Sequence, residues 1–505
     1  MTVTFDFGLL APVLVVGLAA VGVLVIDAAL PRLGRAHWWL AGLVLLVATV
    51  LTAQRWVQIP QRSDGTLCGS GYCAYGVDRV VLSLHLAITV SALAVVLLIS
   101  AIPAPVSRAP VQVALLLSAT AGGLIVCASR DAASWLIALE LATLPTVGLV
   151  ALRARRSAID GSLALLVSAL ISFALAAMGV ALWYAATGTL RFDQAAALHA
   201  IADSGRSRVL ILAIMLLLAG VAFKLSLAPF HAWTPDTFAS ASVPVSAYLA
   251  VTSKVAAVGA LIVVIRSLTG VGGATLSVIG LVSVLSMTLG NLMALRERRM
   301  LRLLAWSTVA QAGWVVMPLA PAGSAAVGES VRYLLMYALA TLVVFAVVTA
   351  VAHARGRGAA LDLGSYHGLA RSRPILGWAM AFALLTLAGV PPALLGVAAK
   401  VAAVGPVVAA HLWWLAVAAA INTMIGLAVY LRWILAIVIR DGQTSGPDAR
   451  LAAANDPAGN DPAGNDPVGS DTEAVAPVHS VVVVVLLLGL VVASVWPQVL
   501  FALPD

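Results

Sequence analysis

Long apolar runs separated by short polar stretches constrain the fold of this chain more than any other feature. Runs of about 20 residues match the hydrocarbon core of a bilayer, which is about 30 Å thick. A backbone in lipid must satisfy its own hydrogen bonds, so only α-helices and closed β-barrels can span it. The runs are continuous, as in VVVVVLLLGLVV near the C-terminus, and show no alternation of period two. The sequence therefore predicts an all-α polytopic membrane protein.

The apolar runs predict fourteen transmembrane helices. The second is unusually short and precedes a polar loop over 55–78. No basic region precedes the first run in MTVTFDFGLL, so we expect a permanent helix and not a cleaved signal peptide. The predicted spans are 8–30, 38–54, 79–102, 110–128, 133–151, 160–186, 207–228, 243–268, 272–295, 301–320, 329–352, 374–402, 408–438 and 479–500.

Arginines divide the connecting loops into two alternating sets, one with sixteen arginines and the other with nine. Arg108, Arg153 and Arg296 belong to the richer set, whereas Arg130 and Arg191 belong to the poorer one. Basic loops are retained in the cytoplasm, so the division predicts a multi-pass protein of a bacterial cell membrane with both termini on the outer side. The net charge of +8 then reflects loop anchors, and no nucleic-acid partner is expected.

Residues 441–478 differ in kind from the rest of the chain. They contain NDPAGNDPAGNDPVG, a tandem repeat of turn-forming residues with almost nothing apolar to bury. Such a composition predicts a disordered, low-complexity linker on the cytoplasmic side, leading to the last helix within 479–505.

Titratable side chains within the apolar runs are few. Only three of the 29 basic residues are lysines, and Lys224, Lys254 and Lys400 all lie inside predicted spans, as does Glu140. Arginine stays protonated, whereas a buried lysine can exchange a proton near neutral pH. Ionisable residues at membrane depth are costly and mark ion pathways. These four residues are the candidate proton carriers, and a static ion pair that fixes helix packing is the alternative.

Prolines interrupt two of the lysine-bearing spans, at Pro229 and at Pro391 and Pro392. Proline removes a backbone donor and clashes with the preceding turn. Interrupted helices at matching positions of two halves are typical of inverted-repeat transporters. The predicted regions are accessory helices (1–109), a first five-helix repeat (110–270, spans 4–8), a second, inverted repeat (271–440, spans 9–13), the linker (441–478) and a last helix (479–505).

His231 follows the first interruption and is either a hydrogen-bonded structural residue or a proton relay. Asp236 and Trp233 are expected to cap and anchor the helix that follows. No CxxC motif or His/Cys cluster is present, so we expect no metal and no cofactor bound by this chain.

Cys68 and Cys73 lie in TLCGSGYCAYG, on the predicted outer side, where disulfides persist. The glycines between them permit a tight turn that brings the two Cα atoms within about 7 Å. We therefore predict a disulfide that stiffens a surface turn and plays no part in transport; two free thiols are the alternative.

Three motifs resemble a known family. They are AFKLSLAPFHAWTPDTFASASVPVSAYLAVTSKVAA, RMLRLLAWSTVAQAGW and LAGVPPALLGVAAK, within residues 110–440. Together they resemble the antiporter-like membrane subunits of proton-pumping NADH:quinone oxidoreductase (respiratory complex I), and FKLSLAPFHAWTPD resembles subunit N. The resemblance implies fourteen helices with two inverted five-helix repeats.

The resemblance also implies roles for individual residues. Glu140 matches an acid that pairs with the lysine of the first broken helix, here Lys224. Lys254 matches a lysine of the central hydrophilic axis, Lys400 a lysine toward the exit side, and His231 the histidine of the linking segment.

Two positions depart from the family pattern. Relatives often carry a lysine where this chain has Ala164 and a histidine where it has Gln311. Neutral residues at these positions can order water but cannot titrate.

The implied activity is electrostatic proton translocation through internal water, without a redox site in this chain. NADH, FMN, iron–sulfur clusters and quinone would be bound by partner subunits in the same membrane. A subunit of a multi-subunit cation/proton antiporter is the main alternative.

Overall fold

Helices make up nearly all of the described chain, in agreement with the apolar runs. The computed structural model describes residues 4–30, 34, 36–58, 64–69, 72–102, 108–153, 155–270, 273–321, 324–355, 362–439 and 475–498. Most of the predicted linker lies outside these residues. The elements are α1 (Phe7–Ala29), α2 (Ala36–Gln58), β1 (Asp64–Gly69), β2 (Tyr72–Val77), α3 (Arg79–Ser100), α4 (Ala109–Ala128), α5 (Ala132–Leu141), α6 (Leu144–Ala151), α7 (Arg156–Thr187), α8 (Gln194–Ala202), α9 (Ser204–Leu225), α10 (Trp233–Ser240), α11 (Val243–Ala250), α12 (Thr252–Ser267), α13 (Gly273–Arg296), α14 (Met300–Val316), η2 (Met317–Leu319), α15 (Ser324–Arg355), η4 (Leu363–Tyr366), α16 (Leu369–Ser372), α17 (Pro374–Ala388), α18 (Leu394–Ala409), α19 (Trp413–Val438) and α21 (Pro477–Val495).

Twelve helical segments of the described chain are long and apolar enough to cross a membrane, and α17 and α18 are shorter apolar helices. Twelve of the predicted spans fall on these twelve segments, whereas the tenth falls on α14 and η2 and the twelfth on α17 and α18. The all-α polytopic fold is therefore confirmed. The count of fourteen crossings and the inverted repeats stay predictions.

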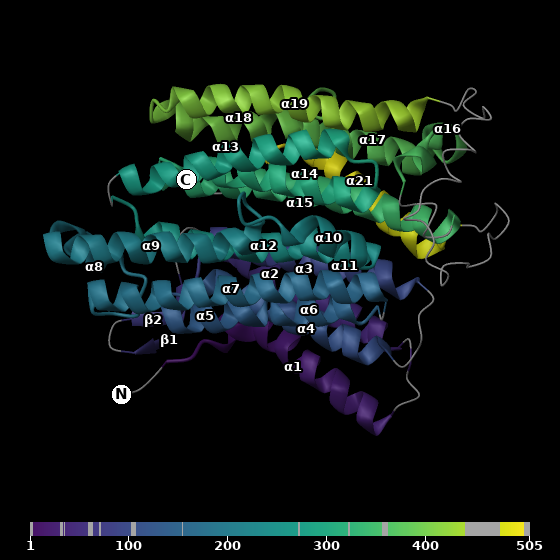
Figure 1. The fold of residues 1–505 in the computed structure, drawn as a ribbon. Helices are drawn as coiled ribbons and strands as arrows, with labels where there is room; N and C mark the ends of the chain where they lie inside the picture. Colours follow the sequence, from purple (N-terminus) through teal and green to yellow (C-terminus); the bar gives the residue numbers. More distant parts are fainter. Residues whose placement is uncertain are drawn as a thin grey trace.

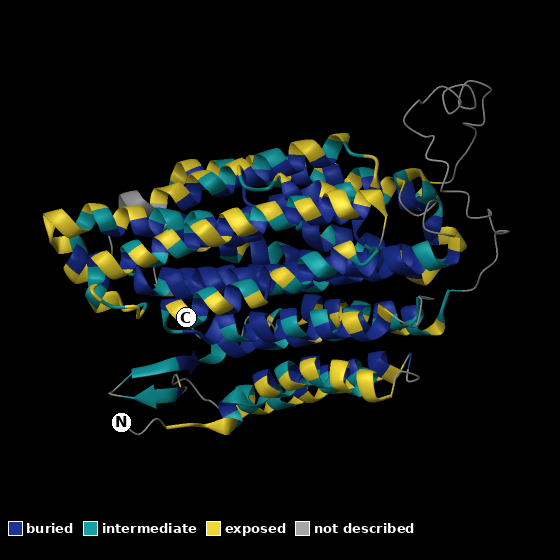
Figure 2. Cartoon of the chain, turned by 60° about the horizontal axis from the view of Figure 1, so that its bottom comes forward, coloured by how far each residue is buried: buried dark blue, intermediate teal, exposed yellow. Residues whose placement is uncertain are grey.

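The long helices run side by side, and their connections lie at two ends (Figure 1). Helix α15 lies between the two halves: it contacts α3, α11 and α12 of the first half and α14, α17 and α18 of the second. The most buried spans are this helix and the α11–α12 segment. Outer helices expose apolar faces instead (Figure 2), as expected of a surface in contact with lipid.

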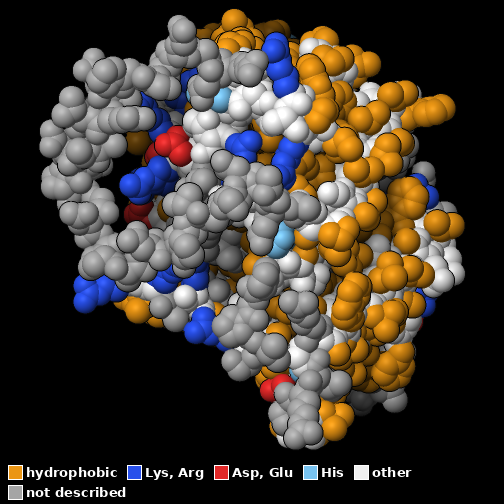
Figure 3. Space-filling model, turned by 90° about the vertical axis from the view of Figure 1, so that its right-hand side faces the viewer, with side chains coloured by type: hydrophobic (Ala, Val, Ile, Leu, Met, Phe, Trp, Pro, Cys, Tyr) orange, Lys and Arg blue, Asp and Glu red, His pale blue; other side chains and the backbone are white. Residues whose placement is uncertain are grey.

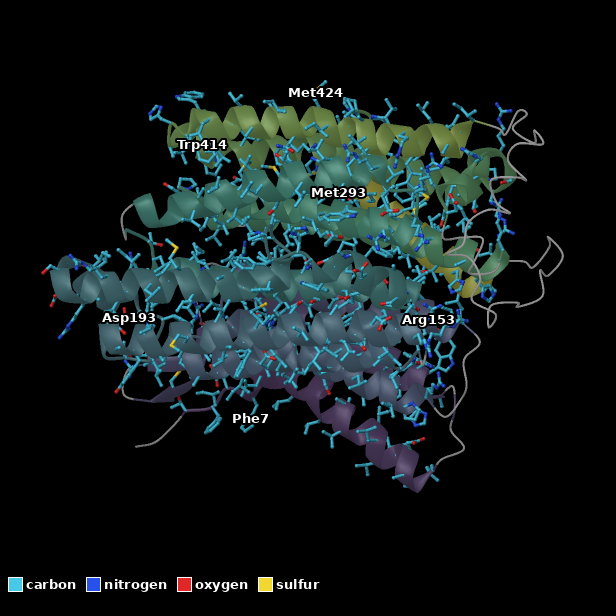
Figure 4. The ribbon with its side chains drawn as sticks, viewed as in Figure 1. Phe7, Arg153, Asp193, Met293, Trp414 and Met424 are labelled. Carbon is cyan, nitrogen blue, oxygen red and sulfur yellow. A yellow bond between two sulfur atoms is a disulfide. The ribbon has the colours of Figure 1, made fainter. Side chains whose placement is uncertain are left out.

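The arginine-rich loops gather at one end of the bundle. Arg153 lies at the right-hand end and Asp193 at the left-hand end (Figure 4). Seen from the right-hand end, the described basic side chains cluster on this face, whereas the flank is hydrophobic (Figure 3). The first helix begins and the last helix ends toward the left-hand end (Figure 1).

The polar loop predicted over 55–78 is more ordered than expected. Helix α2 continues to Gln58, so it is not unusually short, and β1 and β2 form an antiparallel hairpin. The prediction was wrong here because side chains such as Trp56 and Tyr75 pack against neighbouring helices. This packing orders segments whose composition suggests a polar loop. Cys68 and Cys73 face each other across the hairpin and are joined by a disulfide.

Candidate functional site

Lys254 lies near the start of α12, and its side chain reaches the end of α9. Its Nζ donates to the carbonyl oxygen of Lys224 at 2.8 Å and to Ser226 Oγ at 2.6 Å. Thr234 Oγ1 donates to the same serine oxygen at 2.6 Å. The ammonium also lies 4.9 Å from the ring centroid of Trp233, which adds a cation–π contact. Lys254 is thus held by a complete set of polar and aromatic partners.

Lys224 lies in the last turn of α9 and is buried. Its Nζ donates to the carbonyl oxygen of Leu139, the residue before Glu140 on α5. Glu140 and Lys224 are near enough to interact electrostatically but form no ion pair within 4.0 Å. The helix is interrupted after α5: the Thr143 N–H donates to the Glu140 carbonyl at 2.9 Å, and the Leu139 carbonyl accepts from Lys224 Nζ and from Thr143 Oγ1 instead.

Lys400 lies on α18, beyond the second interruption. Its Nζ donates to the carbonyl oxygen of Ala388, the last residue of α17, at 2.5 Å. The ring centroid of Trp314 lies 5.1 Å from Lys400 Nζ, which gives a cation–π contact. The next residue, Gly389, has φ of 72°, and a Cβ there would lie 2.6 Å from Lys400 Cδ. Glycine is therefore required both by the backbone and by the lysine side chain.

All three buried lysines share one arrangement: each donates to a backbone carbonyl near the C-terminal end of an interrupted helix. The last carbonyls of a helix lack intrahelical partners and carry partial negative charge. They stabilise an ammonium without an adjacent carboxylate. A neutral amine can donate to the same oxygen, so a lysine can lose its proton and keep this contact.

A small cavity of about 20 Å³ adjoins Lys224. Its walls include the hydroxyl-bearing residues Thr143, Ser168, Ser172 and Ser253. This volume holds about one water molecule, and the hydroxyls supply the polar partners such a water needs. Ala164 lies one turn before Ser168, whose Oγ donates to the Ala164 carbonyl at 2.7 Å.

Gln311 lies at the centre of a buried network formed by α14, α15, α17 and α19. Tyr333 OH donates to its Oε1 at 2.6 Å, and its Nε2 donates to Tyr430 OH at 2.9 Å. The amide nitrogen also reaches the Leu387 carbonyl at 3.4 Å, one residue before the carbonyl that binds Lys400. Tyr430 OH further contacts Ser307 Oγ at 2.7 Å.

Tyr337 connects this network toward the first half. Its hydroxyl donates to the carbonyl of Ala250 at 2.8 Å, where α11 ends, and lies 3.2 Å from Thr308 Oγ1. Thr308 is one turn before Gln311 on α14. Buried polar groups therefore follow one another from the α11–α12 break to the α17–α18 break.

His231 is not joined to the lysines by any of these hydrogen bonds. Its ring lies 5.3 Å, centroid to centroid, from Trp306 of α14. Trp233 and Asp236 begin α10: the indole Nε1 donates to the Phe223 carbonyl at 2.9 Å, and Asp236 pairs with Arg302 at 2.6 Å. Pro229 lies between α9 and α10, and Pro391 and Pro392 lie between α17 and α18.

Sequence reasoning missed several members of the site, chiefly Ser226, Thr234, Tyr333 and Tyr430. A signal was present, because tyrosine and serine in the middle of apolar spans need hydrogen-bond partners there. Within the described residues, no group of three or more His, Cys, Asp or Glu is placed to hold a metal ion.

Comparison with known proteins shows the family of the chain. The family described as "NADH:quinone oxidoreductase/Mrp antiporter, TM" matches residues 129–426. The chain is 36% identical over 456 residues to NADH-quinone oxidoreductase subunit N 2 of Streptomyces griseus, covering 85% of this chain and 82% of the relative. It is 33% identical to subunit N of Cereibacter sphaeroides, covering 88% and 92%.

Solved structures share the fold. A chain of respiratory complex I from Thermus thermophilus superposes with a TM-score of 0.76 at 26% identity, covering 97% of this chain and 98% of that one. A chain of the Mrp complex from Dietzia sp. gives 0.83 at 20% identity, covering 98% and 96%, and this likeness concerns the fold alone. The fold and the buried lysines define an antiporter-like membrane subunit.

The chain belongs to the membrane-subunit family of NADH:quinone oxidoreductases and Mrp antiporters. Within this family it resembles subunit N of NADH-quinone oxidoreductase, as FKLSLAPFHAWTPD predicts.

Proposed function

We propose that this chain is a proton-translocating subunit of a membrane-bound NADH:quinone oxidoreductase. Quinone reduction in partner subunits, which would hold the FMN, the iron–sulfur clusters and the quinone, would drive proton movement through this one. The observation that carries the proposal is the row of buried lysines on the carbonyls of interrupted helices. A scaffold protein has no use for such titratable groups at membrane depth.

In the proposed route, a proton reaches Lys224 through the hydroxyl-lined cavity beside Thr143. Glu140 favours the charged form of Lys224, and its displacement would release that proton toward Lys254. Lys254 binds the carbonyl of Lys224, so the two ammonium groups are close enough to repel each other. The Gln311 network then leads to Lys400. Gln311 itself carries no exchangeable charge, so ordered water around the tyrosines completes the path.

The orientation is part of the same proposal. The arginine-rich end of the bundle would face the cytoplasm of a bacterial cell, with both termini outside. The two halves, residues 110–270 and 271–440, would form inverted repeats. His231, whose ring lies against Trp306 at an interplanar angle of 49°, would position the link between α9 and α10.

A subunit of a multi-subunit cation/proton antiporter is the second candidate, favoured by the shared fold of the Mrp chain. Purification from native membranes through a tag on this chain separates the two. A complex with flavin and iron–sulfur absorbance and NADH:quinone activity supports the first function. A complex that lacks both, and that exchanges cations for protons, supports the second.

A further inference from the structure

An apolar cavity of about 180 Å³ lies between the two halves of the bundle. Met215 and Ala219 of α9 line one side, and Val278 and Val282 of α13 line the other. None of the three lysines lines it, and nothing in the proposed transport route uses it.

This cavity is a poor site for water, and an apolar group that fills it would gain favourable contacts. Its walls are hydrophobic side chains, and a buried water needs two to four polar partners. An empty space of this size removes dispersion contacts from every atom that lines it. An engineered apolar cavity of about 150 Å³ binds benzene, so a volume of this order accepts a hydrocarbon ligand.

The exposure of the residues around the cavity indicates which hydrocarbon ligand it binds. Val278 lines the cavity and is 37% exposed, and Leu281, on the next turn of α13, is 54% exposed. On the other side, Leu212 of α9 is 52% exposed. The cavity is therefore continuous with the apolar surface that faces the bilayer. We propose that it binds one acyl chain of a membrane phospholipid, inserted between α9 and α13.

The bound chain would contact the link that holds the site. Leu225, Leu227 and Phe230 line the cavity, and Ser226, between the first two, accepts the hydrogen bond from Lys254. Phe230 also packs on Phe223, with ring centroids 4.4 Å apart. The acyl chain thus supports the interrupted end of α9 from its apolar side. This site does not depend on which ion the chain moves.

Site-specific photo-crosslinking in native membranes tests the proposal. Val278 is replaced by p-benzoylphenylalanine, and Leu281, on the lipid-facing surface, is replaced in the matched control. After irradiation the complex is purified through this chain, and adducts are identified by mass spectrometry. We expect phospholipid adducts at both positions. Adding Ala219→Phe, which fills the cavity, should reduce the adduct at 278 to background and leave that at 281 unchanged.

Ala174→Phe on the exposed surface of α7 should change neither adduct. If Ala219→Phe prevents assembly, Ala219→Leu provides a smaller filling group. A polypeptide or quinone adduct at 278 overturns the assignment, as does the absence of any adduct there while 281 is labelled. A phospholipid adduct at 278 that persists with the cavity filled also overturns it.

Discussion

The two interrupted helices end in the same way but use different residues at the turn. Helix α9 ends in Ser226 with φ of 61°, and α17 ends in Gly389 with φ of 72°. A left-handed residue with a side chain costs about 1–2 kcal/mol, so glycine is the expected choice. In the first half, the serine hydroxyl accepts hydrogen bonds from Lys254 and Thr234. In the second half, the methylene groups of Lys400 fill the space that a Cβ at position 389 would need.

This difference separates two kinds of lysine site. The first site has Glu140 nearby and two lysines linked through a backbone carbonyl, so its charge state can be changed by a neighbour. Lys400 has no carboxylate within 4.0 Å among the described residues, only the Ala388 carbonyl and Trp314. Under the proposed function, the first site would respond to a change in charge and the second would receive a proton.

Removing the charge of either Lys224 or Glu140 should have the largest effect on proton pumping. Lys224→Ala or Glu140→Ala should reduce proton pumping about tenfold or more, as expected for a positioned proton-transfer group. Assembly should be retained. Pumping in proteoliposomes and NADH:quinone activity measure the effect, with Leu170→Ala on the exposed face of α7 as the control. Assembled variants that pump like wild type would contradict the proton route.

The two turns should respond in different ways to substitution. Gly389→Ala forces a side chain into a left-handed conformation against Lys400 and should lower stability by about 2 kcal/mol or more. Ser226→Gly relieves the backbone but removes an acceptor for a charged group, so the net loss should be about 1 kcal/mol. Thermal unfolding of the purified complex measures both. Equal effects would remove the distinction between the turns.

Gln311 links α14 to α15 and α19 and does not titrate. Gln311→Ala should decrease pumping less than Lys254→Ala does, because water can replace the amide. It leaves the buried hydroxyls of Tyr333 and Tyr430 short of a partner, at a cost of about 1–3 kcal/mol. Parallel pumping and unfolding measurements separate the two effects. A pumping loss as large as that of Lys254→Ala would show that the amide itself carries the route.

An ion pair lies at the end of α12, the helix that carries Lys254: Asp78, which caps α3, binds Arg266 at 2.6 Å. Burial favours the neutral acid, but Arg266, the Val81 N–H and Arg130 outweigh it and lower the pKa of Asp78. A lowered pKa stabilises the fold above the unfolded value of about 3.9, and this stabilisation is lost as the pH falls below it.

Asp78→Asn keeps a residue that caps helices well and removes only the charge. It should lower stability by about 1–3 kcal/mol at pH 7. Unfolding measured from pH 7 to pH 3 should show the two proteins converging below about pH 4. A difference that is constant across this range would exclude the ion pair as its source.

The hairpin disulfide should have the smallest effect on transport. Alkylation without reductant, followed by mass spectrometry, should find Cys68 and Cys73 unlabelled, and Cys68→Ala with Cys73→Ala should pump like wild type. The buried Cys127 is an internal reference that should label only after unfolding. Free thiols at both positions would contradict the bond and weaken the outer placement of this end.

The sequence by itself determined the membrane fold, most helix positions, the family and the four ionisable residues within the apolar spans. Each follows from local chemistry: apolar length, proline, and the cost of a charge in lipid. It did not reveal the hairpin, whose strands are short and polar, or the break between α11 and α12, which contains no proline.

Only the tertiary structure decided which oxygen each lysine binds. Lys254 finds its partners 28 and 30 residues away, at Ser226 and Lys224, and Lys224 finds Leu139 85 residues away. Tyr430 reaches Gln311 across 119 residues. Such contacts depend on how helices pack and where interrupted helices leave carbonyls free. Because no local pattern encodes that packing, the candidate residues could be named from the sequence, whereas the contacts between them could not.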